Sequence, residues 1–579
     1  MIDWNKQREQ VFLDRYALKD KGGNPLESSP EELWNRVSGY FGDSPEERLA
    51  FRKNMEEFKF VPGGRMLSGA KAGQMVTFYN CFVIGIESKT LDKGNDSRQG
   101  IMDSLSRMIE ISSRGGGVGV NWSTLRPEGA YIKGVHGWSS GANSWMRGAD
   151  GLADQIRQGG SRTAALMFML NDWHPDIIKF VNPTERFKRA NFSVGVSDAF
   201  MRAVRSDSLW NLVFPDTSHP QYNKEWSGDL DSWIGKCLPV KSFGTIPARE
   251  IWSDMCRGAH LTGSPGVVFL ERCNKTSNTW YAENLVCTNP CGEQPLPIGG
   301  CCNLGSINLT SMWDPHTQDI DWVLLAQTVR QSVNFLDNVI DKSVDISEDI
   351  SAVQKMVRRV GLGTMGLADV LILKKLRYGS DESLEFLDVL YSFIRDCAYE
   401  SSIALAVEKG PAPLFDRDKY LKGEFIKRLP ERLQEGILHH GIRNLQLLTQ
   451  PPTGTTSILA GASNGIEPIF SRGYTRRDAT GEYKVIHPLF EGQCGKHLVT
   501  AKEISVSEHI KVQAKIQEYV DSSISKTINL PHDCTPEDIG KAYSLAYDLG
   551  CKGVTVYRTG SLDDVLTDDS EFVCESCQI

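Results

Sequence analysis

The segment Asn289-Pro290-Cys291-Gly292-Glu293 places a thiol between an amide and a carboxylate, with one residue on either side. In an extended strand or a tight loop, residues two positions apart point the same way. We therefore expect Asn289, Cys291 and Glu293 to face one bound molecule. This group offers a sulfur for covalent or radical chemistry, a carboxylate for proton transfer and an amide that orients a substrate.

More thiols accompany this segment. Cys302 lies eleven positions after Cys291, and Cys574 and Cys577 form a Cys-x-x-Cys pair near the end of the chain. Chemistry that consumes thiols and then restores them needs such a set. The terminal pair also has the spacing of half a zinc site, but zinc would need two further ligands at a suitable spacing. The adjacent Cys301 and Cys302 lack the usual gap and the tail has no histidine, so a redox dithiol is the favoured interpretation.

The loop at residues 452–457, Pro-Thr-Gly-Thr-Thr-Ser, combines hydroxyl groups with a glycine ahead of an expected helix. Backbone N–H groups, hydroxyls and the helix dipole together make an anion site without a lysine. The alternative is a polar turn. The loop is not a Walker motif, because no Gly-Lys-Ser/Thr follows it.

Residues 361–366, Gly-Leu-Gly-Thr-Met-Gly, match the dinucleotide-binding fingerprint letter for letter. That fingerprint requires a buried strand before it. Residues 353–359 look helical and basic instead, so we interpret the motif as a tight packing turn. Residues 115–119 are also rich in glycine, which lets a backbone approach a ligand closely.

The 579 residues carry 64 Lys and Arg against 73 Asp and Glu, a net charge of −9. This balance does not indicate a nucleic-acid binder. The first residues contain no apolar core of a signal peptide, and no apolar run reaches membrane-spanning length. We therefore expect the fourteen cysteines to lie in a reducing cytoplasm, where a disulfide tends to be catalytic and transient.

Strand and helix patterns alternate along the chain. Residues 1–60 read as helical, with a helix start at Pro30, and residues 61–200 alternate Gly-rich turns with short apolar runs that predict buried strands. Helices follow, one with a single apolar face and another over 382–409, and a strand is predicted over 444–449. This alternation predicts an α/β architecture. The apolar face comprises Val329, Val333, Leu336 and Ile340.

The last twenty-one residues, 559–579, contain no Lys or Arg and are predicted to form a mobile acidic tail. About fourteen residues separate Gly560 from Cys574, and a flexible linker of that length spans roughly 20 Å. The tail is therefore long enough to carry its thiols from the surface into a deep pocket.

Taken together, these segments resemble the catalytic chain of ribonucleotide reductases from about residue 60 to 560. The matching motifs stand in family order at 62–67, 79–84, 115–122, 125–127, 173–177, 289–293, 302–309, 361–369, 452–457, 465–468 and 552–558. The resemblance implies a ten-stranded α/β barrel, residues 61–558, with Cys291 at the tip of an inner finger loop. A small helical region, residues 1–60, would precede it.

The resemblance also implies a mechanism. Cys291 would carry a thiyl radical that abstracts the ribose 3′ hydrogen, Glu293 would take the 3′-hydroxyl proton as general base, and Asn289 would hold that hydroxyl. The 2′-hydroxyl would then leave as water. Cys81 and Cys302 would supply the reducing equivalents and end as a disulfide.

Exchange with the tail thiols Cys574 and Cys577 would reduce that disulfide again. A thioredoxin-like or glutaredoxin-like protein would supply the electrons. The motif at 302–309 and the eleven-residue step from Cys291 favour Cys302 over Cys301, which is left without a defined role.

Two binding sites carry over from the family. Substrate contacts match Asn80, Cys81, Gly117, Asn289, Pro452, Thr453, Gly454, Thr455 and Thr456. A deoxynucleoside triphosphate effector would contact Asp96, Ser97, Gly160, Ser161 and Arg162. The resemblance implies no protein-bound metal, and a homodimer is expected.

Family members that receive their radical from a metal-containing partner usually have two adjacent tyrosines near the C-terminus. This chain has Val556-Tyr557 there, and its tail lacks a glycyl-radical motif. These departures favour the adenosylcobalamin-dependent class. Diphosphate substrates are preferred over triphosphates because the chain is compact and resembles the dimeric members of the family.

Three alternatives stay open. One is a catalytic subunit served by a separate radical-generating subunit. Another is a non-catalytic nucleotide sensor, although a sensor has no use for five redox cysteines and Glu293. The last is a zinc-ribbon nucleic-acid binder, which the acidic tail opposes.

Overall fold

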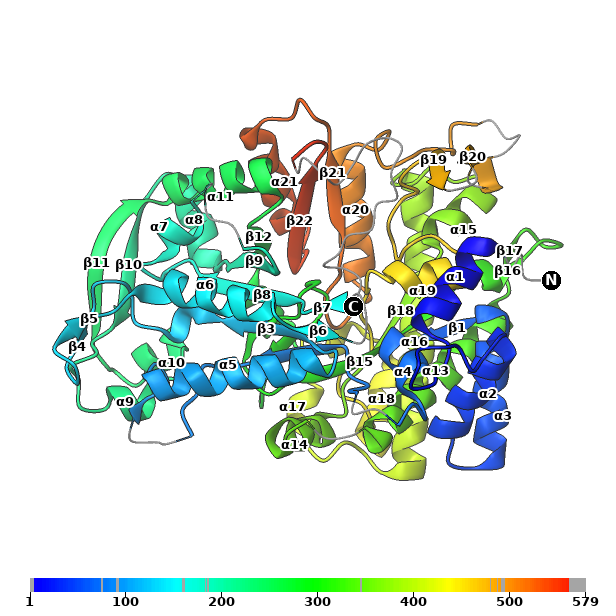
Figure 1. The fold of residues 1–579 in the computed structure, drawn as a ribbon, viewed down its shortest axis with the longest axis horizontal. Helices are drawn as coiled ribbons and strands as arrows, with labels where there is room; N and C mark the ends of the chain where they lie inside the picture. Colours follow the sequence, from blue (N-terminus) through cyan, green and yellow to red (C-terminus); the bar gives the residue numbers. More distant parts are fainter. Residues whose placement is uncertain are drawn as a thin grey trace.

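The structure is a computed structural model that describes residues 5–73, 76–89, 93–158, 162–182, 184, 187–343, 346–478, 481–486, 488–490 and 495–561. Its elements run from an N-terminal helical region into a large mixed α/β body (Figure 1). The predicted tail thiols Cys574 and Cys577, and the predicted effector residues Gly160 and Ser161, lie outside the described residues.

Three helices form the N-terminal region: α1 (Lys6–Arg15), α2 (Pro30–Phe41) and α3 (Pro45–Met55). The predicted helix start at Pro30 is confirmed, and Ser29 and Glu32 close a capping box around it. The region leads into β1 (Phe60–Pro62), which pairs antiparallel with β15 (Cys301–Asn308) and so joins the helices to the main sheet.

The main sheet of the described residues has ten strands, which are β1 and nine further strands in two parallel groups that run in opposite directions. The first group is β2 (Cys81–Ile84), β3 (Gly117–Asn121), β8 (Leu166–Asn171), β9 (Ala190–Gly195) and β12 (Gly266–Val268). The second contains β15 with β18 (Val360–Met365), and β21 (Thr527–Leu530) with β22 (Gly553–Arg558). The groups meet antiparallel at β2–β15 and at β12–β22.

Residues 446–450 close the sheet on itself. On one side the Leu362 N–H donates to the Leu447 carbonyl at 2.8 Å. On the other side the Ser522 N–H donates to Leu448 at 3.0 Å, and the Ser525 N–H donates to Gln450 at 2.9 Å, just before β21. The strand predicted over 444–449 is thus an extended segment with isolated bridges, and it links β18 to the β21 side of the sheet.

Helices cover the outside of this closed sheet (Figure 1). The longer ones are α5 (Arg98–Ser113), α6 (Gly141–Ala153), α8 (Asp198–Ser206), α11 (Ala248–Thr262), α13 (Trp322–Lys342), α14 (Glu348–Val357), α16 (Asp381–Lys409), α18 (Glu431–His440), α20 (Val506–Gln517) and α21 (Pro536–Asp548). The shorter ones are α4 (Gly64–Gly69), α7 (Ile177–Phe180), α9 (Tyr222–Glu225), α10 (Leu230–Gly235), α12 (Leu270–Lys275), α15 (Leu367–Leu373), α17 (Arg417–Tyr420) and α19 (Gly454–Ala460). None of the described helices is both long and apolar enough to cross a membrane.

Six two-stranded ribbons complete the fold. They are β4 (Tyr131–Ile132) with β5 (Gly137–Trp138), β6 (Arg157–Gln158) with β7 (Arg162–Thr163), β10 (Leu209–Pro215) with β11 (Val240–Pro247), β13 (Leu285–Thr288) with β14 (Pro295–Pro297), β16 (Trp313–Asp314) with β17 (Asp319–Ile320), and β19 (Gly473–Asp478) with β20 (Gly481–Ile486). The β13–β14 ribbon positions the Cys291 segment.

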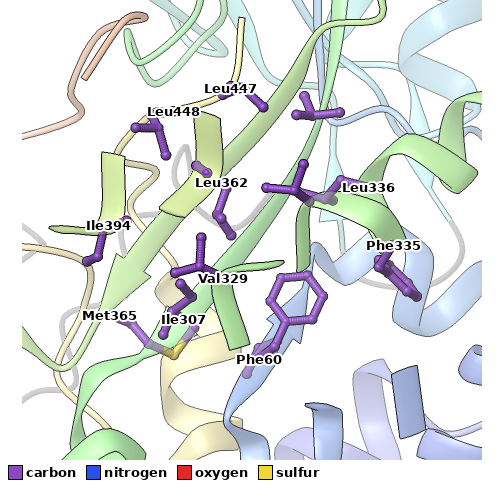
Figure 2. Packing of buried hydrophobic residues seen from close by; sticks show 14 of the residues in the cluster. Phe60, Ile307, Val329, Phe335, Leu336, Leu362, Met365, Ile394, Leu447 and Leu448 are labelled. Carbon is purple, nitrogen blue, oxygen red and sulfur yellow. The ribbon is translucent and has the colours of Figure 1, made fainter. Parts of the chain in front are cut away.

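The largest apolar core of the described residues lies between strands β1, β15 and β18 and the helices that pack on them, including α1 to α3 and α13. Figure 2 shows Val329 and Leu336 of α13 packed with Ile307 of β15 and Leu362 of β18. The predicted apolar face of α13 is confirmed, because all four of its residues are buried in this core. The predicted helix over 382–409 is confirmed as α16, which ends at Gly410 with φ +83°.

The Gly361–Gly366 motif is a strand and not a turn, which corrects the expectation from the sequence. α14 precedes it as predicted, but residues 360–365 form β18, and a turn begins only at Gly366 with φ +80°. A Cβ on Gly363 would lie 2.5 Å from both the Thr449 carbonyl oxygen and Pro451 Cδ. The glycines therefore allow residues 449–451 to pass directly over the strand.

Gly363→Ala should lower the free energy of unfolding by about 1–3 kcal/mol, because the methyl group forces the 449–451 backbone away from β18. Urea unfolding of the full chain measures this change. The matched control is Gly148→Ala in α6, where a Cβ meets nothing within 4 Å and alanine favours the helix. Equal stability of Gly363→Ala and wild type would show that the crossing is not tight.

Candidate active site

The Cys291 segment is the tip of a hairpin, called here the finger, formed by β13, β14 and residues 289–294. Asn289 and Gln294 close the tip. The Asn289 N–H donates to the Gln294 carbonyl at 3.1 Å, and the Gln294 N–H donates to Asn289 Oδ1 at 2.9 Å. A turn follows in which the Gly292 N–H donates to the Asn289 carbonyl at 3.1 Å, with φ +83° at Gly292. The tight loop expected from the sequence is confirmed.

The finger lies inside the closed sheet. Cys287 and Leu296 of the finger share a buried cluster with the inward side chains of β2, β8 and β15. A Cβ on Gly119 of β3 would lie 1.9 Å from the Thr288 carbonyl oxygen, so only glycine lets β3 pass the finger. Of the Gly-rich stretch at 115–119, Gly119 thus makes room for the finger.

The backbone carbonyl of Glu293 anchors the tip where the sheet closes. It accepts hydrogen bonds from the Thr449 hydroxyl at 2.8 Å, the Ser523 N–H at 3.0 Å and the Ser522 hydroxyl at 3.1 Å. The buried ammonium of Lys552 donates to the carbonyls of Asp521 and Ser522 at 2.7 and 2.8 Å. Lys552 therefore fixes the segment that holds Glu293.

The Glu293 carboxyl group is buried, and that burial raises its pKa to about 7. One oxygen, Oε1, lies 3.7 Å from Cys81 Sγ. The other, Oε2, is buried and has no hydrogen-bond partner among the described residues. A carboxylate with a pKa near neutrality and an unused oxygen is suited to take a proton from a bound hydroxyl.

Cys81 and Cys302 stand directly opposite each other on the antiparallel strands β2 and β15. Opposite Cβ atoms lie about 4.5–5.5 Å apart in such pairs, slightly more than a disulfide requires. Asn289 Nδ2 donates to Cys81 Sγ at 3.1 Å. Burial raises the pKa of both thiols well above the usual value, so both are neutral and adjacent, as a dithiol reductant needs to be.

Cys301 points the other way. Neighbouring side chains on a strand alternate between faces, and Cys301 belongs to the apolar cluster beneath the outer helices while Cys302 belongs to the inner one. The choice of Cys302 made from the motif agrees with this placement.

A partly open pocket contains the finger tip. Its lining unites Asn80, Cys81, Asn289, Cys291, Glu293 and the five predicted loop residues Pro452, Thr453, Gly454, Thr455 and Thr456. It also includes Tyr16, Gly63, Gly64 and Ser306, which sequence reasoning missed. The predicted substrate contact Gly117 does not line the pocket but pairs with Cys81 across β2 and β3.

The hydroxyl-rich loop turns into α19 as predicted. Thr453 adopts a left-handed conformation with φ +55°, and its hydroxyl accepts a hydrogen bond from the Gly465 N–H at 2.7 Å. The first turn of a helix has N–H groups without intrahelical acceptors, which suits an anion. None of the described residues that line the pocket is Lys or Arg.

The structure describes three of the predicted effector residues, Asp96, Ser97 and Arg162. Arg126 donates to both oxygens of the buried Asp96 carboxylate at 2.6 and 3.0 Å, and the Tyr222 hydroxyl donates to it at 2.7 Å. Ser97 caps α5, and Arg162 lies in β7. The Asp96 carboxylate is therefore engaged by partners within the chain, and its effector role stays a prediction.

Replacing Glu293 with Gln should stabilise the protein at pH 8. A carboxyl group with a pKa near 7 in the folded state and near 4.5 in the unfolded state makes folding progressively less favourable as the pH rises between those values. The full effect above pH 7 is about 3 kcal/mol. Urea unfolding of Glu293→Gln and wild type from pH 5 to 8 measures it, and the gap should shrink toward pH 5.

The exposed Glu385→Gln in α16 is the control, and its stability should follow wild type at every pH. If Glu293→Gln is no more stable than wild type at pH 8, ionisation of the buried Glu293 does not lower the free energy of unfolding.

Comparisons with known proteins agree with this geometry. Residues 79–557 match the family model for the barrel domain of ribonucleotide reductase, and residues 5–74 match the model for its all-alpha domain.

Individual relatives point the same way. The chain is 36% identical over 547 residues to the vitamin B12-dependent ribonucleoside-diphosphate reductase of Thermoplasma acidophilum, covering 88% of this chain and 65% of that protein. It is 32% identical over 597 residues to the protein of the same name from Mycobacterium tuberculosis, covering 95% and 79%. The ribonucleoside-diphosphate reductase subunit alpha of Synechocystis is 27% identical over 566 residues, covering 89% and 69%. The chain belongs to the ribonucleotide reductase large-chain family.

Proposed function

We propose that this chain reduces ribonucleoside diphosphates to 2′-deoxyribonucleoside diphosphates by a thiyl-radical mechanism. The observation that carries the proposal is the meeting of Cys291, Glu293, Asn289 and Cys81 in one pocket whose other wall is the hydroxyl-rich loop. Cys302 of β15 stands opposite Cys81 of β2 on the neighbouring strand. The proposal therefore places the ribose at the finger tip and the phosphates at α19.

Each residue has a defined role in the proposed reaction. The Cys291 thiyl radical takes the 3′ hydrogen, and Glu293 takes the proton of the 3′-hydroxyl that Asn289 holds. The bond between C2′ and oxygen breaks, and the oxygen leaves as water. The Cys81 and Cys302 thiols give two electrons and two protons and become a disulfide. Glu293 returns its proton to the 3′ oxygen, and Cys291 returns the 3′ hydrogen. A pKa near 7 supports Glu293 as the base.

Adenosylcobalamin is the proposed radical source, as the names of the Thermoplasma and Mycobacterium relatives suggest. When bound, it supplies the radical that oxidises the Cys291 thiol. The pocket is partly open, and a cofactor outside it would reach Cys291 through that opening. Cys291 is only partly buried at the tip and lines the pocket with Pro290, so these two residues fit that approach.

A separate radical-generating subunit is the second candidate. The Synechocystis relative is named a subunit alpha, which favours such a partner, but its identity of 27% is lower than the 36% and 32% of the B12-dependent relatives. Cofactor dependence of product formation distinguishes the two. A nucleotide sensor, in turn, would bind substrate and form no product.

Further parts of the proposal rest on the family resemblance. They are an allosteric deoxynucleoside triphosphate effector, a homodimer, and a C-terminal tail whose Cys574 and Cys577 reduce the internal disulfide with electrons from a thioredoxin-like protein.

Cys291→Ser should lower the rate of deoxynucleotide formation by more than 1,000-fold, because a serine hydroxyl is a far poorer radical carrier than a thiol. A loss of this size is expected when an essential catalytic group is removed. Product chromatography measures the rate, and calorimetry should find CDP binding within about twofold of wild type. The exposed Cys237→Ser is the control and should keep full activity. Turnover by Cys291→Ser would exclude Cys291 as the radical carrier.

Cys574→Ser should stop turnover with thioredoxin as electron donor yet leave it within about twofold of wild type with dithiothreitol, since a small dithiol can enter the pocket directly. Steady-state rates with the two reductants measure the difference. Cys397→Ser in α16 is the control for loss of a thiol outside the predicted relay. Equal loss with both reductants would rule out a relay role for the tail.

A further inference from the structure

Tyr16 belongs to the N-terminal helical region, yet it lines the pocket that contains Cys291. Its hydroxyl hydrogen-bonds the Thr455 hydroxyl, across 439 positions of sequence. Its ring packs beside Gly64, where an added Cβ would lie 3.1 Å from Tyr16 Cε1. Tyr16 is fully buried, and its hydroxyl meets the pocket lining at Thr455.

Two sets of contacts hold Tyr16 in place. Helix α1 lies along α19 (Figure 1), and Arg8 Nε donates to the Leu459 carbonyl at 3.0 Å at the far end of that contact. The Tyr16 carbonyl accepts a hydrogen bond from Arg36 Nη2 at 3.1 Å, and Arg36 forms a buried ion pair with Glu27 at 2.6 Å. The phenol is therefore fixed in direction before any ligand binds, which lowers the entropic cost of a contact with it.

The chemistry of the pocket calls for a further donor. A diphosphate brings negative charge into a pocket whose described lining contains no Lys or Arg. Backbone N–H groups and neutral hydroxyls must then satisfy the phosphate oxygens. A tyrosine hydroxyl can donate one such bond, and bonds to an ionised oxygen are about twice as strong as neutral ones.

We propose that Tyr16 is a substrate-positioning residue, which donates a hydrogen bond to the terminal phosphate of the bound ribonucleotide beside Thr455. This inference deepens the proposed function and rests on it, because it needs the phosphates at residues 453–456. It makes α1 part of the substrate site. The hydroxyl of Thr455, which Tyr16 now contacts, turns toward the same phosphate.

A purely structural role is the competing explanation. The bond between Tyr16 and Thr455 would then only fasten α1 to α19, and its loss would disturb the whole pocket. Binding of a nucleoside without phosphates separates the two explanations. A phosphate contact affects CDP and leaves cytidine unchanged, whereas a general loosening weakens both ligands.

The test compares Tyr16→Phe with wild type as full-length chains, with CDP and cytidine as probes in isothermal titration calorimetry. Loss of a charge-assisted hydrogen bond should weaken CDP binding about tenfold and leave cytidine binding within twofold. In the turnover assay KM for CDP should rise by a similar factor while kcat stays within about twofold. The control is Tyr40→Phe in α2, a partly buried tyrosine of the same region whose ring packs on Phe41 and Phe78.

Thr455→Val provides a second variant in case Tyr16→Phe folds poorly. If both hydroxyls serve one phosphate, Thr455→Val should also lose affinity for CDP alone, and the double variant should lose less than the product of the two single losses. Equal weakening of CDP and cytidine, or unchanged CDP binding, would overturn the role of Tyr16 while leaving the proposed reaction intact. A wild-type chain that binds CDP no better than cytidine would overturn this role together with the phosphate site.

Discussion

The backbone carbonyl of Glu293 accepts three hydrogen bonds, and the arrangement of the site depends on them. The donors Thr449, Ser522 and Ser523 come from the two segments that close the sheet. A hairpin tip inside a barrel has no neighbouring strand that fixes it, so these bonds determine where Cys291 lies. The same closure places residues 452–456 directly after the anchoring segment 446–450, and so couples the position of the finger tip to that of the proposed phosphate loop.

Burial gives the site its chemistry and also limits it. Removing Glu293 and the paired thiols from water raises the pKa of each, which keeps the thiols neutral and brings the carboxyl close to neutrality. A shielded interior protects a radical from water and oxygen. The oxidised Cys81–Cys302 pair would then be out of reach of a large reductant, which is why the proposed mechanism needs a narrow, mobile carrier of electrons.

The sequence predicted most of the chemical groups because they lie in short motifs. The tip residues, the phosphate loop and Cys302 were found from local spacing. Other features depend on contacts between distant segments. Position 363 of β18 needs a glycine because residues 449–451 cross the strand there, which no local pattern encodes. Tyr16 was missed because its partner Thr455 is 439 residues away. The bonds from Arg126 and Tyr222 to the Asp96 carboxylate likewise join segments that no local spacing relates.

The most direct measurement is anaerobic deoxynucleotide formation from CDP and CTP, with dithiothreitol and a deoxynucleotide effector, in the presence and absence of adenosylcobalamin. We expect dCDP only when the cofactor is present, and a lower rate from CTP than from CDP. Product without the cofactor would contradict the proposed radical source. Folded protein that binds CDP but forms no product under either condition would contradict the proposal that this chain alone completes the reaction.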